Sequence, residues 1–198
     1  MRKTMTDASG QTQYGYDSLN RLLTKQTPEG TLTYQYDDAG NIKTVRSSNV
    51  NGVSNDYGYD SLNRLSTVLD NRRNGTTQYG YDNVGNLLNY IYPNGVQTNH
   101  NYDTLNRLLG IASANFQAIS AYEYTLGAAG NRLSVSQIGT RQVNYVYDDL
   151  YRLKSETIKG DAVTANNGAI NYQYDPVGNR LSRASAIAAI PSSSHTFD

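Results

Sequence analysis

The chain has 198 residues, of which 17 are basic and 17 acidic, so its formal net charge is zero. Balanced charge gives no electrostatic footprint for nucleic acid or for an anionic membrane surface. The chain has no cysteine, which excludes disulfides and cysteine-based metal sites. It also has no apolar run long enough to span a bilayer and no apolar leader of the secretory type at its start. We therefore expect no nucleic-acid partner and no membrane insertion, and these features alone leave the compartment open.

The aromatic residues are almost all tyrosine: there are 18 tyrosines, two phenylalanines and no tryptophan. The mean hydropathy of −0.64 is polar for a globular protein. Disordered chains are poor in aromatic residues, whereas this chain is 10% aromatic. A buried tyrosine ring contributes a large apolar body while its hydroxyl keeps a hydrogen-bond partner. The composition therefore predicts an ordered fold that is built on tyrosine.

A Tyr-x-Tyr-Asp motif recurs along the chain at intervals of about 22 residues. Six complete copies are present, and two copies are altered. His100 replaces the first tyrosine of the fifth unit, and Tyr122 and Tyr124 form a sixth unit without the aspartate. The motif residues are Tyr14, Tyr16, Asp17, Tyr34, Tyr36, Asp37, Tyr57, Tyr59, Asp60, Tyr79, Tyr81, Asp82, Tyr102, Asp103, Tyr145, Tyr147, Asp148, Tyr172, Tyr174 and Asp175.

Each unit has the pattern of a β-hairpin. Side chains alternate along a strand, so the two tyrosines of a motif share one face, and the aspartate can start a turn by accepting backbone N–H groups. Three residues later stands a residue that tolerates the left-handed conformation of a type I turn followed by a bulge. These residues are Asn20, Gly40, Asn63, Gly85, Asn106 and Gly178, with Tyr151 as a strained exception. The return strands begin at Leu22, Ile42, Leu65, Leu87, Leu108 and Leu153.

Turn residues such as Pro28-Glu29-Gly30, Asn74-Gly75 and Pro93-Asn94-Gly95 connect one unit to the next. The sixth unit, Tyr124 to Leu133, is longer than the eighth and predicts a wider loop. We expect tandem repeats over residues 1–181, with the first repeat entered part-way through. An Ala/Ser-rich connection follows at 182–194, and the start of a ninth repeat at 195–198, where Phe197 takes a tyrosine position.

The motif, followed by Gly or Asn, Arg or Asn and then Leu, resembles the YD repeat of RHS proteins. That family includes bacterial polymorphic toxins, toxin-complex components and the teneurins. The resemblance implies an all-β fold in which tandem antiparallel hairpins make one open curved or spiralling sheet, a part of a shell. In the bacterial members the shell encloses a toxic domain. The resemblance also implies a secreted or cell-surface setting, with the rest of a larger repeat protein or an enclosed effector as partner.

The repeated side chains have alternative interpretations. Rows of tyrosine could stack on sugars, but cross-strand packing within the sheet is favoured; outside the motif, Tyr90 and Tyr92 are candidates for ligand contact. The motif aspartates could bind calcium, but one carboxylate per hairpin suits a turn better. The arginines Arg21, Arg64, Arg107, Arg132, Arg152 and Arg180 could bind anions, but we expect them to pair with the motif aspartates.

No nucleophile–base set is evident, because His100 and His195, the only histidines, stand at a tyrosine position of the repeat. We therefore predict a structural segment, not an enzyme, with no cofactor and no metal. The alternatives are a carbohydrate-binding repeat module of a cell-surface or secreted protein and, less favoured, a glycosidase or lyase on a β-solenoid.

Overall fold

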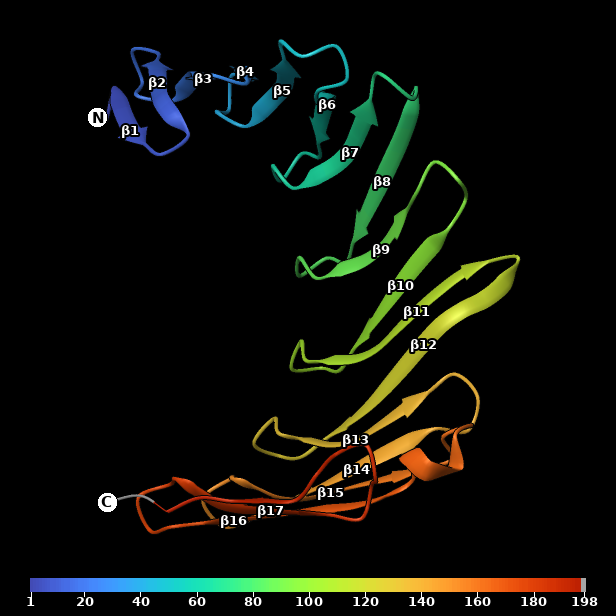
Figure 1. The fold of residues 1–198 in the computed structure, drawn as a ribbon. Helices are drawn as coiled ribbons and strands as arrows, with labels where there is room; N and C mark the ends of the chain where they lie inside the picture. The colour runs from blue at the N-terminus through green and yellow to red at the C-terminus, as the bar shows by residue number, and fades with distance from the viewer. Residues whose placement is uncertain (197–198) are drawn as a thin grey trace. The chain divides into compact units, whose positions relative to one another are not determined.

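The computed structural model describes residues 1–196, in which successive strands pair as antiparallel hairpins (Figure 1). These described residues form eighteen strands of one antiparallel sheet and a single 3-10 turn at Thr164–Asn166, without an α-helix. This confirms the predicted all-β fold of tandem hairpins. No helix between residues 1 and 196 has the length and apolar character needed to cross a membrane.

The chain divides into two compact units, Met1–Gln97 and Thr98–Asp198. In the first unit each strand pairs antiparallel with the next. Its strands are β1 (Thr4–Asp7), β2 (Gly10–Tyr16), β3 (Leu22–Thr27), β4 (Gly30–Tyr36), β5 (Ile42–Ser47), β6 (Ser54–Tyr59), β7 (Leu65–Asp70), β8 (Gly75–Tyr81) and β9 (Leu87–Ile91).

The second unit continues the same pattern, and its strands pair in order from β11 to β18. β10 begins at the last residue of the first unit. The strands are β10 (Gln97–Tyr102), β11 (Leu108–Asn115), β12 (Gln117–Leu126), β13 (Arg132–Gln137), β14 (Gln142–Tyr147), β15 (Leu153–Lys159), β16 (Gly168–Tyr174), β17 (Arg180–Ser185) and β18 (Ser193–Ser194).

The motif turns have the predicted bulge and the predicted left-handed residue. In the first hairpin the register shifts between Gly15 and Tyr16, and Asn20 has a φ of 64°. Left-handed φ values recur at each predicted position: Gly40, Gly85 and Gly178 have φ of 90°, 98° and 99°, Asn63 and Asn106 have 59° and 60°, and Tyr151 has 59°. Tyr151 is therefore the predicted strained residue, because a bulky side chain is costly in this region.

The sixth hairpin corrects the prediction of a wider loop. Leu126 pairs with Arg132 across β12 and β13, as Tyr16 pairs with Leu22 in the first hairpin. The turn closes with the Gly127 N–H donating to the Asn131 carbonyl, and this turn is as long as the others. Tyr124 therefore occupies the first tyrosine position and Leu126 the second. The sequence predicted the wrong register here because Tyr122 and Tyr124 have the Tyr-x-Tyr spacing of the motif but stand two residues before its true position.

The densest packing lies in the second unit, where Val143, Ile158 and Ile170 from β14–β16 are joined by Ile187. Ile170 and Ile187 are 2% and 3% exposed. Ile187 belongs to the Ala/Ser-rich stretch 182–194. That stretch also contributes the end of β17 and all of β18. The predicted ninth repeat reaches residues 197–198, which lie outside the described residues.

Candidate functional site

The motif aspartates organise the turns through their carboxylates. Asp17 Oδ1 accepts the backbone N–H groups of Leu19 and Arg21 at 2.9 and 2.8 Å. The same pair of bonds is made by Asp60, Asp103 and Asp148. The hydrogen bond from the Arg21 N–H is the main cause that lowers the pKa of Asp17. The carboxylates are therefore held ionised by their own turns.

Arginines four residues after the aspartate connect one repeat to the next. The Arg64 Nε donates to Asp60 Oδ2 at 2.7 Å within its own turn, and its Nη1 donates to the Asp82 carbonyl of the following turn at 3.0 Å. The guanidinium carbon also lies 4.7 Å from the centroid of the Tyr81 ring. A planar cation can make all three contacts at once, which lysine cannot.

We call the contacts of Arg64 the arginine clamp, and they recur wholly or in part in other repeats. Arg152 bonds Asp148 and the Asp175 carbonyl and lies 5.0 Å from the Tyr174 ring centroid. Arg21 bonds Asp17 and lies over Tyr36 at 4.5 Å. Arg107 bonds Asp103 and the Gly127 carbonyl. Where asparagine replaces arginine, as at Asn41, Asn86 and Asn179, its amide donates to the aspartate of the same turn.

Two of the predicted arginine–aspartate pairs were wrong. Arg132 and Arg180 stand one position later in their hairpins, where the return strand begins, as the Tyr174–Arg180 ladder pair shows. Their guanidinium carbons lie 4.6 Å from the Tyr124 ring centroid and 5.9 Å from the Tyr172 ring centroid. In both hairpins an asparagine, Asn131 or Asn179, takes the position that arginine has in the other turns.

The second tyrosine of a motif connects its hydroxyl to the preceding repeat. Tyr81 donates to the Leu65 carbonyl at 2.9 Å, and Leu65 is the first residue of the preceding return strand. The equivalent hydroxyls donate to the equivalent carbonyls in other repeats. These bonds are Tyr16 to Arg2, Tyr36 to Leu22, Tyr59 to Ile42, Tyr147 to Arg132 and Tyr174 to Leu153.

The first tyrosines pack across the hairpin. Tyr34 and Tyr57 stand opposite Val45 and Val68 in the strand register. Tyr172 differs, because its hydroxyl donates to Glu156 Oε1 at 2.5 Å. Burial and then this bond raise the pKa of Tyr172 to about 12.

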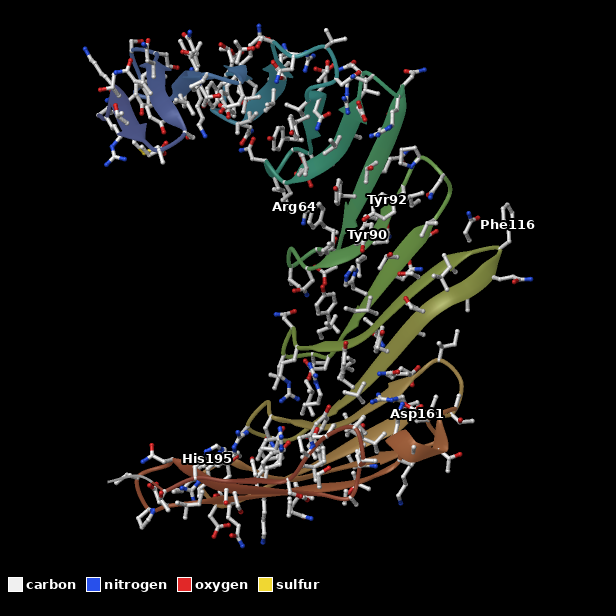
Figure 2. All side chains as sticks on the ribbon, in the orientation of Figure 1. Arg64, Tyr90, Tyr92, Phe116, Asp161 and His195 are labelled. Atoms are coloured by element: carbon white, nitrogen blue, oxygen red, sulfur yellow. The ribbon has the colours of Figure 1, made fainter. Side chains whose placement is uncertain are left out.

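The candidate ligand contacts Tyr90 and Tyr92 form an aromatic group with Tyr79. Tyr79 and Tyr90 are a cross-strand pair with ring centroids 6.1 Å apart, and Tyr90 meets Tyr92 edge-on at 5.2 Å. Figure 2 labels both residues on the first unit. The Tyr92 side chain is 45% exposed, so part of its ring is accessible. This is a packed group with one open ring, and sequence reasoning did not detect that Tyr90 opposes a motif tyrosine.

A hollow of about 450 Å³ lies on the second unit, at β10–β13. Gly110, Ala112 and Ala121 line it together with Asn101 and Glu123. The small side chains of the glycine and the alanines leave this hollow unfilled, and the hollow is open to solvent.

The two histidines do not come together at this hollow. His100 lies in β10, whereas the His195 backbone N–H donates to the Leu181 carbonyl beyond β18. Among residues 1–196 no group of three or more histidine, aspartate or glutamate side chains is arranged to hold a metal ion.

Comparison with known proteins gives the same family as the motif. Residues 2–32 and 59–97 match the RHS Repeat family model. No curated protein was found to match the sequence. The crystal structure of TcdB2-TccC3 aligns with a TM-score of 0.74 and 17% identity, over 95% of this chain and 12% of that chain. The crystal structure of TcdB2-TccC3-TEV aligns with a TM-score of 0.54 and 18% identity, over 89% of this chain and 11% of that chain.

At these identities the structural likeness establishes the fold, and the chain spans only a small part of the chains that it matches. The repeated motif, the matched segments and the shared fold lead to one conclusion: residues 2–32 and 59–97 match RHS repeats, and the chain is similar to RHS repeat proteins.

Proposed function

We propose that this chain is a stretch of the wall of a larger RHS shell, which encloses or displays an effector or contact domain. The observation that carries the proposal is the use of the motif side chains. The arginine cations and the second tyrosine hydroxyls contact the neighbouring repeat, as Arg64 and Tyr81 do. The aspartate carboxylates are engaged by their own turns. The side chains that recur most regularly in the sequence therefore stabilise the turns and hold neighbouring repeats of the sheet together.

The coverage of the matched chain supports the same proposal. This chain aligns over nearly its whole length with a small portion of TcdB2-TccC3, which is consistent with one segment of a longer repeat wall. In repeat proteins each unit contacts mainly its neighbours, so stability is distributed along the array. The partner would then be the remainder of the repeat protein or the domain that it encloses, in a secreted or cell-surface setting.

Protease protection tests the proposal on the native polypeptide that contains this sequence. We expect a segment outside the repeats to resist proteolysis while the repeats are folded, and to be cleaved once the repeats are unfolded by urea. If that polypeptide has no segment whose protection depends on folded repeats, enclosure is refuted. Display would then have to be shown by binding.

A carbohydrate-binding module is the second candidate, and the accessible ring of Tyr92 favours it. A glycan array probed with the wild-type chain and with Tyr92→Ala tests it. Saturable binding that Tyr92→Ala removes would support this candidate. Equal signals for the two proteins, or no binding across the array, would eliminate it. Phe116→Ala, which removes an exposed ring from a different hairpin, is the matched control.

A further inference from the structure

One hairpin departs from the repeat in length. β11 has 8 residues and β12 has 10, whereas every other described strand has at most 7. On the β11 side, the Thr98 hydroxyl lies 2.8 Å from the Ser113 hydroxyl, and β10 begins one residue before Thr98. On the β12 side, the ladder with β13 starts at the Tyr122–Gln137 pair. Residues 115–120 therefore reach past both neighbouring strands, and we call these residues the arm.

The pairing within the arm is irregular. The register of β11 and β12 shifts between Ser113 and Ala114, which leaves Ile119 as an extra, bulged residue of β12. A bulge interrupts the ladder of backbone hydrogen bonds. Phe116 at the tip has a φ of 58°, in a region that is costly for a bulky side chain. Opening the arm therefore breaks few regular ladder bonds and relieves backbone strain.

The side chains of the arm are accessible from solvent. Phe116 has a relative accessibility of 106%, and Figure 2 shows it at the end of the β11–β12 hairpin. Gln117 and Ala118 are exposed as well, and Ile119 is 56% exposed. Exposed loop tips are preferred sites of proteolytic cleavage, and the rate follows the population of the locally opened form. The arm offers an endoprotease an apolar side chain and a segment that opens at low cost.

The motif turns expose apolar side chains without offering such a segment. Leu105 is 68% exposed, but its backbone N–H donates to Asp103 Oδ1 at 2.9 Å. The same carboxylate binds Arg107, whose Nη1 donates to the Gly127 carbonyl at 3.0 Å. A protease can bind Leu105 in an extended conformation only after these bonds have broken. Local opening therefore costs more in a motif turn than in the arm.

We propose that the arm is a proteolytic processing site, cleaved between Phe116 and Gln117 by an endoprotease with an apolar specificity pocket. In this hydrolysis, water adds to the Phe116 carbonyl carbon, and the bond to the Gln117 nitrogen breaks. The products are a carboxylate on Phe116 and an amine on Gln117, so no co-reactant other than water is consumed. The Phe116 ring, which is fully exposed, enters the specificity pocket.

The cut leaves the rest of the sheet in place. It divides the chain into residues 1–116 and 117–198. β11 and β12 remain joined along Gly110–Ser113, where four ladder pairs lie between the arm and the motif turns. The hydrogen bond from Arg107 to the Gly127 carbonyl also spans the two products. Processing therefore nicks the chain without taking the sheet apart.

Limited digestion of the folded chain with chymotrypsin tests the site, with mass spectrometry to locate the first cut. We expect this cut after Phe116, ahead of the tyrosines in the strands. The two products should elute together from a size-exclusion column and separate in urea. Phe116→Ala should slow the cut at least about tenfold, because the specificity pocket loses its apolar side chain. Leu105→Ala is the matched control and should leave the rate unchanged.

Phe116→Lys separates the accessibility of the arm from the preference of chymotrypsin. Trypsin should cut this variant first at the same position, ahead of the basic residues in the motif turns. A disulfide from Ala114→Cys with Ala118→Cys, which stand opposite each other, should protect the arm until it is reduced. The proposal is overturned if the first cuts fall in the motif turns, if Phe116→Ala is cleaved as fast as wild type, or if the products separate without denaturant.

Discussion

Replacing Arg64 by alanine is the most informative test of the contacts between repeats. The side chain is 26% exposed and makes an ion pair, a hydrogen bond to a carbonyl of the next repeat and a cation–π contact. A partly exposed ion pair contributes about 0.2–1 kcal/mol, and a cation–π contact about 0.5–1 kcal/mol. The hydrogen bond to the Asp82 carbonyl is only partly buried and adds roughly 1 kcal/mol. We expect Arg64→Ala to lower the free energy of unfolding by about 1.5–3 kcal/mol.

Equilibrium urea unfolding, followed by circular dichroism, measures this loss. Arg73→Ala is the control: the Arg73 side chain is 78% exposed and makes an ion pair with Asp70, so about 0–0.5 kcal/mol should be lost. A double-mutant cycle with Tyr81→Leu should give a coupling energy of about 0.5–1 kcal/mol. A loss below about 0.5 kcal/mol for Arg64→Ala, or the same loss for both arginines, would refute the clamp as a stabilising contact.

Four further outcomes follow from the structure. Ile187→Ala should lower the free energy of unfolding by about 2–4 kcal/mol in a chemical denaturation, because Ile187 is 3% exposed; an unchanged midpoint would contradict its place in the core. Tyr151→Asn should raise the free energy of unfolding by about 0.5–1 kcal/mol, because asparagine tolerates the φ of 59° better than tyrosine does. A lower melting temperature for this variant would contradict backbone strain at Tyr151. The pKa of Asp103 lies below its ordinary 3.8, chiefly because its carboxylate accepts the Arg107 N–H. The stability that Asp103 contributes is therefore present above pH 3.8 and is lost as the pH falls through the lowered pKa. Asp103→Asn should make the free energy of unfolding depend less steeply on pH in the acid range. The pKa of Tyr172 is raised from 10.0 to about 12. The stability that Tyr172 contributes is therefore complete below pH 10.0 and is lost as the pH rises through about 12. In Glu156→Gln the phenolate absorbance should appear at a lower pH than in wild type.

The sequence predicted the hairpins well because their turns are local. The aspartate and the left-handed residue three positions later lie within one turn, so Asp17 and Asn20 reveal the same geometry in the sequence and in the structure. The register of the sixth hairpin was missed because Tyr122 and Tyr124 have the motif spacing. Strand pairing decides that register, and it places Leu126 in the second tyrosine position.

Contacts between repeats could not be predicted in the same way. The reach of Arg64 to the Asp82 carbonyl and of the Tyr81 hydroxyl to Leu65 joins residues 16 to 18 positions apart, and only the stacking of hairpins brings them together. Ile187 was missed because a single isoleucine in an Ala/Ser-rich stretch has no periodicity.

Hydrogen–deuterium exchange of wild type and Arg64→Ala most directly tests the claim that motif side chains connect consecutive repeats. The account predicts faster exchange in β7 and β8, on both sides of the lost clamp, with β2 and β3 unchanged. Faster exchange confined to the turn between Asp60 and Arg64 would contradict it, because the arginine would then stabilise its own turn alone.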